Sequence, residues 1–177
     1  MKLDINSKGY IFLYSTILVV VVAVLLSAAA MWLQPYQQRN IENEKRAMIL
    51  KAAGVGGDGK IVFIDGELPV YVVNGEVTVL PMRGNGLWGP IWGYLAVSAD
   101  GQTVIGAVFD HKSETPGLGG EITTEKFQSQ FAGKEFMRNG AMAPLEVDAI
   151  SGATKTSNGV KDMIDNTMRK YSPYFEK

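Results

Sequence analysis

The order of apolar and polar positions divides the chain into one uninterrupted apolar run followed by short alternating segments. The run Tyr10–Leu33 (YIFLYSTILVVVVAVLLSAAAMWL) contains no charged residue, no His, no Asn and no Gln. As a helix rising about 1.5 Å per residue it extends roughly 36 Å, enough to cross a hydrocarbon core of about 30 Å. A cleaved signal peptide is the competing interpretation. The run is longer than the apolar core of such a peptide, so the sequence favours a retained single-pass anchor over residues 1–36.

The flanks of this run carry lysines and arginines on both sides, and their distribution leaves the orientation of the anchor in the membrane open. Residues 37–59 then change in pattern. A thin apolar face at helical spacing predicts a polar helical linker that ends near Ala53, and Gly54 is a suitable stop. The Gly-rich stretch after it leads into a folded domain that we expect over residues 60–177.

The remaining segments consist of short β-branched runs separated by turns. The clearest is Pro69–Pro81, in which two such runs flank Asn74-Gly75, the pair that best adopts a type I′ hairpin turn. A short helix is expected after Thr123 or Thr124, and the apolar spacing from Ser157 to Tyr171 predicts an amphipathic closing helix. Further strands are predicted at Ile61–Ile64, Gly93–Ser98, Thr103–Phe109 and Leu145–Ile150. Because no βαβ alternation occurs, these elements predict an α+β domain with antiparallel strands and a C-terminal helix.

Composition excludes several classes of chemistry. Lys+Arg number 17 against 18 for Asp+Glu, and this balance argues against a nucleic-acid partner. The sequence has no cysteine and a single histidine, His111. It therefore holds no iron–sulfur cluster, Cys-type zinc site, disulfide or His-rich metal site of its own. Redox or metal chemistry must come from a bound organic cofactor or from a partner.

The strongest candidate site is the segment Asp148–Asn158 (DAISGATKTSN), which leads into the closing helix. Hydroxyls and small residues here precede the free N–H groups and the positive end of the helix dipole, an arrangement that favours a bound anion. The alternative is that Thr156 or Ser157 caps the helix and nothing binds. The candidate residues are Ser151, Gly152, Ala153, Thr154, Thr156 and Ser157.

Two Gly-rich segments could add to this site. His111–Glu121 (HKSETPGLGGE) turns at Pro116-Gly117, and its glycines allow a close approach to a partner or a flat ligand. Arg83–Tyr94 (RGNGLWGPIWGY) sets two tryptophans among glycines, which can wall a planar ligand. From the residues alone, the first segment reads more readily as a simple connection between strands, and the second as a plug at the edge of the core.

Taken together, the three segments resemble the FMN-binding domain family. DAISGAT matches the family's Asp-x-x-Ser-Gly-Ala-Thr pattern, at which a flavin transferase attaches FMN through its phosphate to the last threonine. By position that threonine is Thr154, and Asp148 is a recognition residue for the transferase. The resemblance carries the flavin-contacting loop onto Glu114, Thr115, Gly117, Leu118 and Gly119, and the Gly-rich aromatic segment onto Leu87, Trp88 and Gly89.

The resemblance implies a membrane-anchored flavoprotein subunit of a Na⁺-translocating NADH:quinone oxidoreductase, which relays electrons through covalent FMN and has no independent turnover. It implies a location in the cell inner membrane, with the FMN domain on the periplasmic side. The implied partners are membrane lipid, iron–sulfur and second-FMN subunits of the same complex, and the flavin transferase during maturation. Two alternatives remain: the equivalent subunit of an Rnf ion-translocating ferredoxin:NAD oxidoreductase, and a flavin-free membrane-anchored interaction module.

Overall fold

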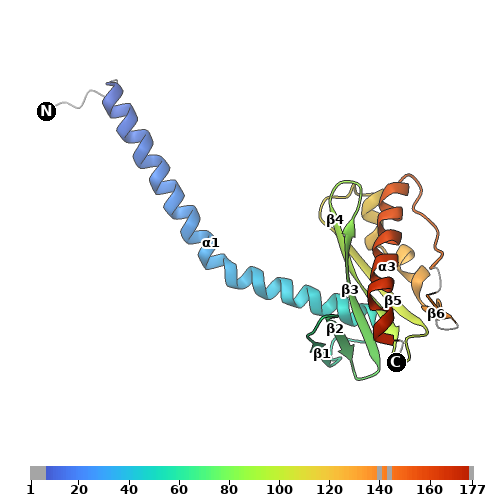
Figure 1. Ribbon diagram of the computed structural model, residues 1–177. Helices are drawn as coiled ribbons and strands as arrows, with labels where there is room; N and C mark the ends of the chain where they lie inside the picture. The colour runs from blue at the N-terminus through green and yellow to red at the C-terminus, as the bar shows by residue number, and fades with distance from the viewer. Residues whose placement is uncertain (1–6, 139–140, 143–144, 176–177) are drawn as a thin grey trace. The chain divides into compact units, whose positions relative to one another are not determined.

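The computed structural model describes residues 7–138, 141–142 and 145–175. Its elements run from a long helix, α1 (Lys8–Ala52), through a five-stranded sheet to a closing helix, α3 (Thr154–Phe175) (Figure 1). The chain divides into two compact units between Glu44 and Lys45. This architecture confirms the predicted α+β class, with a long apolar helix ahead of antiparallel strands.

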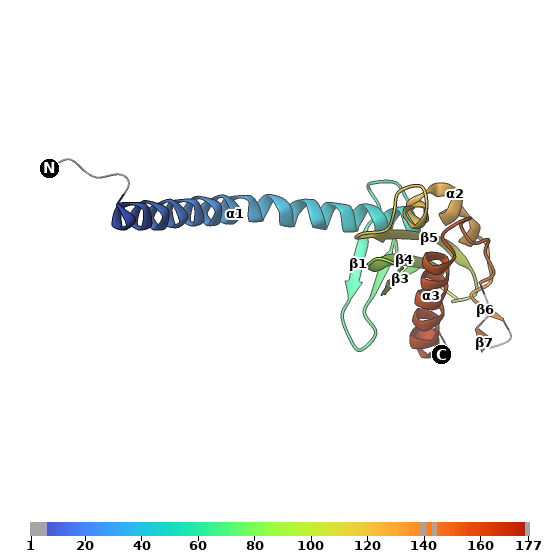
Figure 2. The same ribbon diagram turned by 90° about the horizontal axis from the view of Figure 1, so that it is seen from above.

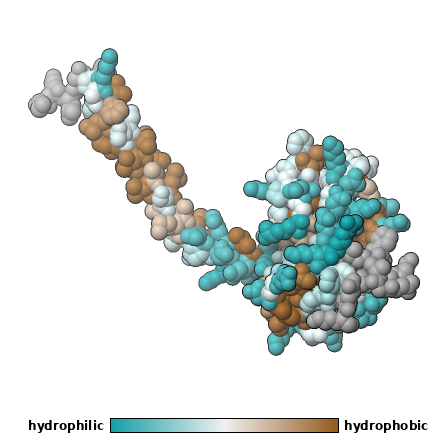
Figure 3. Space-filling model, in the orientation of Figure 1, coloured by the Kyte–Doolittle hydropathy of each residue, from teal (hydrophilic) through white to brown (hydrophobic). Residues whose placement is uncertain are grey.

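The first unit contains most of α1, a helix of 45 residues. Among the described residues, α1 is the one helix whose length and composition suit a membrane crossing. Figure 3 shows hydrophobic side chains gathered along much of it, and Pro35 lies inside the helix without ending it. A contiguous apolar surface of this size is not stable in water. Helix α1 is therefore a candidate membrane span.

The last turns of α1 belong to the second unit, where they pack on the sheet. The helix ends in a Schellman motif: the N–H of Val55 donates to the carbonyl of Leu50 at 2.9 Å, and that of Gly54 donates to Lys51 at 3.1 Å. Gly54 has φ +68°, a conformation that glycine adopts without strain. The predicted stop at Gly54 is confirmed. The buried side chains of these turns are Ile49, Leu50 and Ala52.

The sheet is antiparallel throughout, and its strands pair in chain order. At the predicted hairpin, Asn74 has φ +54° and Gly75 has φ +80°, as a type I′ turn requires. The register pairs Val73 with Val77. The loop therefore contains Asn74, Gly75 and Glu76, one residue more than the shortest hairpin loop. The strands are β1 (Ile61–Ile64), β2 (Val70–Val73), β3 (Val77–Asn85), β4 (Pro90–Ser98) and β5 (Val104–His111).

Successive side chains along a strand point to opposite faces of the sheet. Because apolar residues occur at both sets of positions, both faces of this sheet are apolar. Along β3, Leu80 and Met82 belong to the larger core cluster, which α3 covers, whereas Val79 belongs to the cluster under the end of α1. In Figure 2 the sheet lies between these last turns of α1 and α3. Helix α3 thus packs on one face of the sheet, and this packing fixes the position of its first turn.

Short elements connect β5 to α3. They are η1 (Gly119–Thr123), α2 (Glu125–Gln128), η2 (Ser129–Phe131), β6 (Met137–Arg138) and β7 (Ala141–Met142). Helix α2 begins after Thr124, as predicted. The strand predicted at Leu145–Ile150 is wrong, because this segment pairs with no strand. Instead the side chain of Gln130 accepts the N–H of Asp148 at 2.8 Å, so a side-chain amide satisfies the backbone there.

Candidate functional site

The first turn of α3 carries the threonine that the sequence singled out. Thr154 is the first residue of the helix, three positions earlier than the periodicity predicted, and its side chain is exposed. Its hydroxyl forms no hydrogen bond within the described part of the chain. Gly152, two residues before it, has φ +76°. Because the first N–H groups of a helix lack partners inside it, Thr154 stands where negative charge is favoured.

Thr156 and Ser157 are inside the helix, so neither caps it, and the capping alternative is wrong for both. Ser157 instead secures the preceding loop. Its Oγ donates to the carbonyl of Ala153 at 3.0 Å and accepts the N–H of Ile150 at 3.0 Å. Ala153 and Ser157 are buried, whereas Ser151 and Gly152 are exposed beside Thr154. The loop before Thr154 is therefore held from within.

Thr156 points into the domain and meets Glu114. Its hydroxyl donates to Glu114 Oε2 at 2.6 Å, and the N–H of Trp88 donates to Glu114 Oε1 at 2.8 Å. One carboxylate therefore joins all three segments that the sequence marked out. Burial by itself raises the pKa of Glu114. The hydrogen bonds from Thr156, Trp88 and Gly89, with His111 nearby, outweigh it and lower the pKa below its ordinary value.

Exposed apolar side chains lie beside the threonine loop (residues 148–153) and on the Trp88 loop (residues 86–89). Leu118 is 42% exposed, and its Cδ2 lies 3.0 Å from where a Cβ on Gly152 would stand. A larger residue at position 152 would thus push Leu118 away from the threonine loop. In the other loop, Leu87 is 46% and Trp88 66% exposed. These side chains offer apolar surface for a flat ligand.

The other residues predicted in the Glu114 loop shape its backbone. The carbonyl of Thr115 accepts the N–H groups of Leu118, at 3.1 Å, and Gly120, at 2.9 Å, and the side chain of Thr115 is exposed. Gly117 has φ +75°, as a turn after proline requires. Gly119 is buried against the Glu114 carboxylate. His111 Nδ1 accepts the N–H of Glu114 at 3.2 Å, so it too positions this loop.

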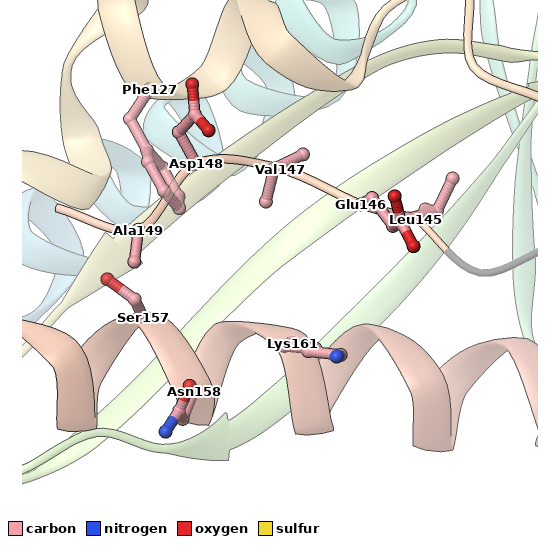
Figure 4. Close-up of a pocket in the computed structure, with 9 residues that line it drawn as sticks. All are labelled: Phe127, Leu145, Glu146, Val147, Asp148, Ala149, Ser157, Asn158 and Lys161. Carbon is pink, nitrogen blue, oxygen red and sulfur yellow. The ribbon is translucent and has the colours of Figure 1, made fainter.

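Two neighbouring hollows flank the segment that precedes the threonine loop. The smaller, of about 150 Å³, lies between residues 145–149 and α3, and Figure 4 shows Ala149 and Ser157 facing one another across it. The larger, of about 550 Å³, lies between Asp148–Ser151 and the α2 region. Asp148 lines both and is exposed. The sequence did not point to Gln130, which holds the backbone of Asp148, because the two residues are 18 positions apart and share no pattern along the chain.

The threonine at a helix N-terminus, the positive-φ glycine and the exposed apolar loops define a domain suited to hold a phosphorylated flat ligand. Residues 86–169 match the FMN-binding domain family. The chain is also similar to the crystal structure of the NqrC subunit of the Na⁺-translocating NADH-quinone reductase from Parabacteroides distasonis. The TM-score is 0.71 and the identity 30%, covering 82% of this chain and 98% of that one. The chain belongs to the FMN-binding domain family, and the resemblance predicted from the sequence is confirmed.

The relatives point to a particular branch of this family. The NqrC subunit of the Na⁺-translocating NADH-quinone reductase from Pasteurella multocida is 46% identical over 110 residues, which are 52% of this chain and 42% of that protein. The same subunit from Vibrio vulnificus is 37% identical over 147 residues, which are 73% and 57%. The chain thus spans about half the length of these curated relatives. Shewanella oneidensis NqrC, at 22% identity and a TM-score of 0.64 over 75% of this chain and 96% of that one, shares the fold.

Proposed function

We propose that this chain is a membrane-anchored flavoprotein subunit of a Na⁺-translocating NADH:quinone oxidoreductase and relays electrons through FMN joined by a phosphoester to Thr154. The relatives named as the NqrC subunit of that reductase support the assignment. The single observation that carries the site is Thr154 itself, exposed as the first residue of α3, with its hydroxyl making no hydrogen bond to the residues that the structure describes.

The residues around Thr154 fit such a group. Thr154 Oγ1 would hold the phosphate at the positive end of α3, where the helix dipole and free N–H groups would stabilise its negative charge. Gly152 keeps the backbone free of a side chain next to it. Leu118 and Trp88 then provide exposed apolar surface for the ring, and the loop glycines allow a close backbone approach. Thr115 and Ser151 belong to the loops that frame this site, and Thr156 lies buried in the first turn of α3.

When bound, FMN would supply the redox chemistry. Covalent attachment to Thr154 would prevent it from diffusing away from the membrane-anchored chain. The chain would contribute position and electrostatics: Thr154 would hold the phosphate, and the loops that carry Glu114 and Trp88 would hold the ring. No independent turnover is expected of the chain alone. The proposed partners are iron–sulfur and second-FMN subunits in the cell inner membrane, with the FMN domain on the periplasmic side. The exposed Asp148, held by Gln130, is the proposed recognition residue for the flavin transferase.

Attachment is tested by co-expressing the full chain with the flavin transferase and measuring intact mass, followed by peptide mapping. The wild type should gain one FMN less one water on the peptide that contains Thr154. Thr154→Ala should lose this adduct and keep the urea midpoint of the wild type. Ser129→Ala is the matched control, because it removes an exposed hydroxyl that lies outside the threonine motif, and it should keep the adduct. An unmodified Thr154 in fully matured wild type, or an adduct on another residue, would refute the proposal.

A further inference from the structure

Glu114 is the one buried charged side chain in the described part of the chain, with 4% of its surface exposed. A buried carboxylate is strongly destabilising unless hydrogen bonds or charges compensate it. Its compensation comes from the Thr156 hydroxyl, the backbone amides of Trp88 and Gly89, and the nearby His111. The hydrogen-bond donors belong to two segments other than that of Glu114, so the carboxylate lies where three segments meet.

We propose that the Glu114 carboxylate is a positioning residue that assembles the flavin site, with one oxygen holding the first turn of α3 and the other holding the Trp88 loop. Through Thr156, Oε2 fixes the helix that carries Thr154. Through the N–H of Trp88, Oε1 fixes the loop that presents the exposed indole. This role differs from direct contact with the ring, and as a statement about the flavin site it rests on the proposed function.

Glycines on both sides support this role. A Cβ on Gly86 or on Gly119 would collide with the carboxylate oxygens of Glu114, and a Cβ on Gly119 would also stand 2.7 Å from Thr156 Oγ1. Both backbones therefore close directly on the carboxylate and leave no room for a side chain there. Such an enclosure strengthens the hydrogen bonds, because the local dielectric is low.

The charge of Glu114 has consequences that a neutral hydrogen-bonding group would lack. Its lowered pKa keeps it ionised at neutral pH. The stability that it contributes is full above the pKa of an unfolded Glu, about 4.3, and is lost as the pH falls through the lower folded value. A negative charge near the flavin also disfavours adding electrons to it. The charge-neutral Glu114→Gln should therefore shift the flavin potential in the positive direction.

The assembly role can be tested on the flavin-free full chain in detergent, by amide NMR and hydrogen exchange. The amide shifts of Trp88 and Gly89 should titrate together, with a midpoint below that of an ordinary Glu. Glu114→Gln should abolish this shared titration. The exchange of the Trp88 amide should become roughly 10- to 100-fold faster, as expected for the loss of a hydrogen bond to a charged group. Glu125→Gln, which removes an exposed carboxylate in α2, is the matched control and should change neither readout.

Thr156→Val keeps the charge and removes the hydroxyl, so it tests the role even if Glu114→Gln does not fold. It should loosen the first turn of α3 and slow FMN attachment without the positive shift in potential, and Thr156→Ser should restore the wild-type rate. Two amides that do not titrate together, or Trp88 exchange unchanged in Glu114→Gln, would overturn the inference. A wild type that never takes up FMN is detected separately by its mass and would refute the proposed function instead.

Discussion

Replacing Gly159 by alanine sets two opposing effects against each other in α3. Alanine is favoured over glycine inside a helix by about 1 kcal/mol. Here, however, a Cβ would lie inside 3.0 Å of the carbonyl oxygen of Asn85 and 3.3 Å from its carbonyl carbon. Both atoms belong to the backbone of β3 and cannot rotate away. Helix α3 must therefore move off the sheet by roughly half an ångström or more to restore ordinary contact.

That movement weakens the packing of Val160, Met163 and Ile164, which are all buried against the sheet. Overpacking of a core typically costs about 1–3 kcal/mol, and the immovable backbone places this case at the upper end. After subtracting the gain in helix propensity, we expect Gly159→Ala to destabilise the domain by about 1–2 kcal/mol. For a domain of this size, the melting temperature should fall by about 3–8 °C.

Urea unfolding of the detergent-solubilised full chain, followed by tryptophan fluorescence, measures this change. Asn166→Ala is the matched control, because it lies exposed in the same helix and gains propensity without a new contact, so it should be neutral or slightly stabilising. The displaced helix should also weaken the bond between Thr156 and Glu114 and slow FMN attachment at Thr154. A Gly159→Ala variant as stable as the wild type, or more stable, would refute the reasoning.

Three further predictions concern the turn, a tyrosine and the orientation. Gly75→Ala, at φ +80°, should lower the free energy of unfolding by about 1–2 kcal/mol in urea, whereas Gly57→Ala, in open space, should not. Burial, with Tyr71 nearby, raises the pKa of Tyr94 to about 12. In the unfolded chain the phenol of Tyr94 ionises at a lower pH, so the free energy of unfolding should fall as the pH rises from about 10 to about 12. Tyr94→Phe should remove this loss of stability. It should also remove the part of the tyrosinate absorbance that rises near pH 12. The chain has no cysteine, so Glu76→Cys in intact cells should react with an impermeant maleimide if the domain is periplasmic, and an unlabelled cysteine contradicts that side.

Local patterns predicted the elements whose cause is local. The hairpin at Asn74-Gly75 follows from the two residue types that best accept positive φ, and the end of α1 at Gly54 follows from the same preference. The apolar length of α1 follows from composition alone. Strand β1 was also located, because a β-branched run next to a turn favours an extended chain.

Predictions failed where a distant partner decides the outcome. Leu145–Ile150 has the composition of a strand, yet the side chain of Gln130, rather than a neighbouring strand, pairs with its backbone. The start of α3 at Thr154 instead of Ser157 accompanies the hydrogen bond of Thr156 to Glu114, a partner 42 residues away along the chain. The spacing of apolar residues does not reveal such contacts, because it depends only on residues that are close together in the chain.

By itself, the sequence determined the apolar helix, the antiparallel domain and the threonine motif that marks the family, because each depends on residues that are close together in the chain. Only the tertiary structure decided that Glu114 is buried and shared between the Trp88 loop and α3. The hydrogen bond from Thr156 to Glu114 spans 42 residues, and the ionisation of that carboxylate depends on donors that folding alone brings together. Its environment, and therefore its lowered pKa, is a property of the folded domain.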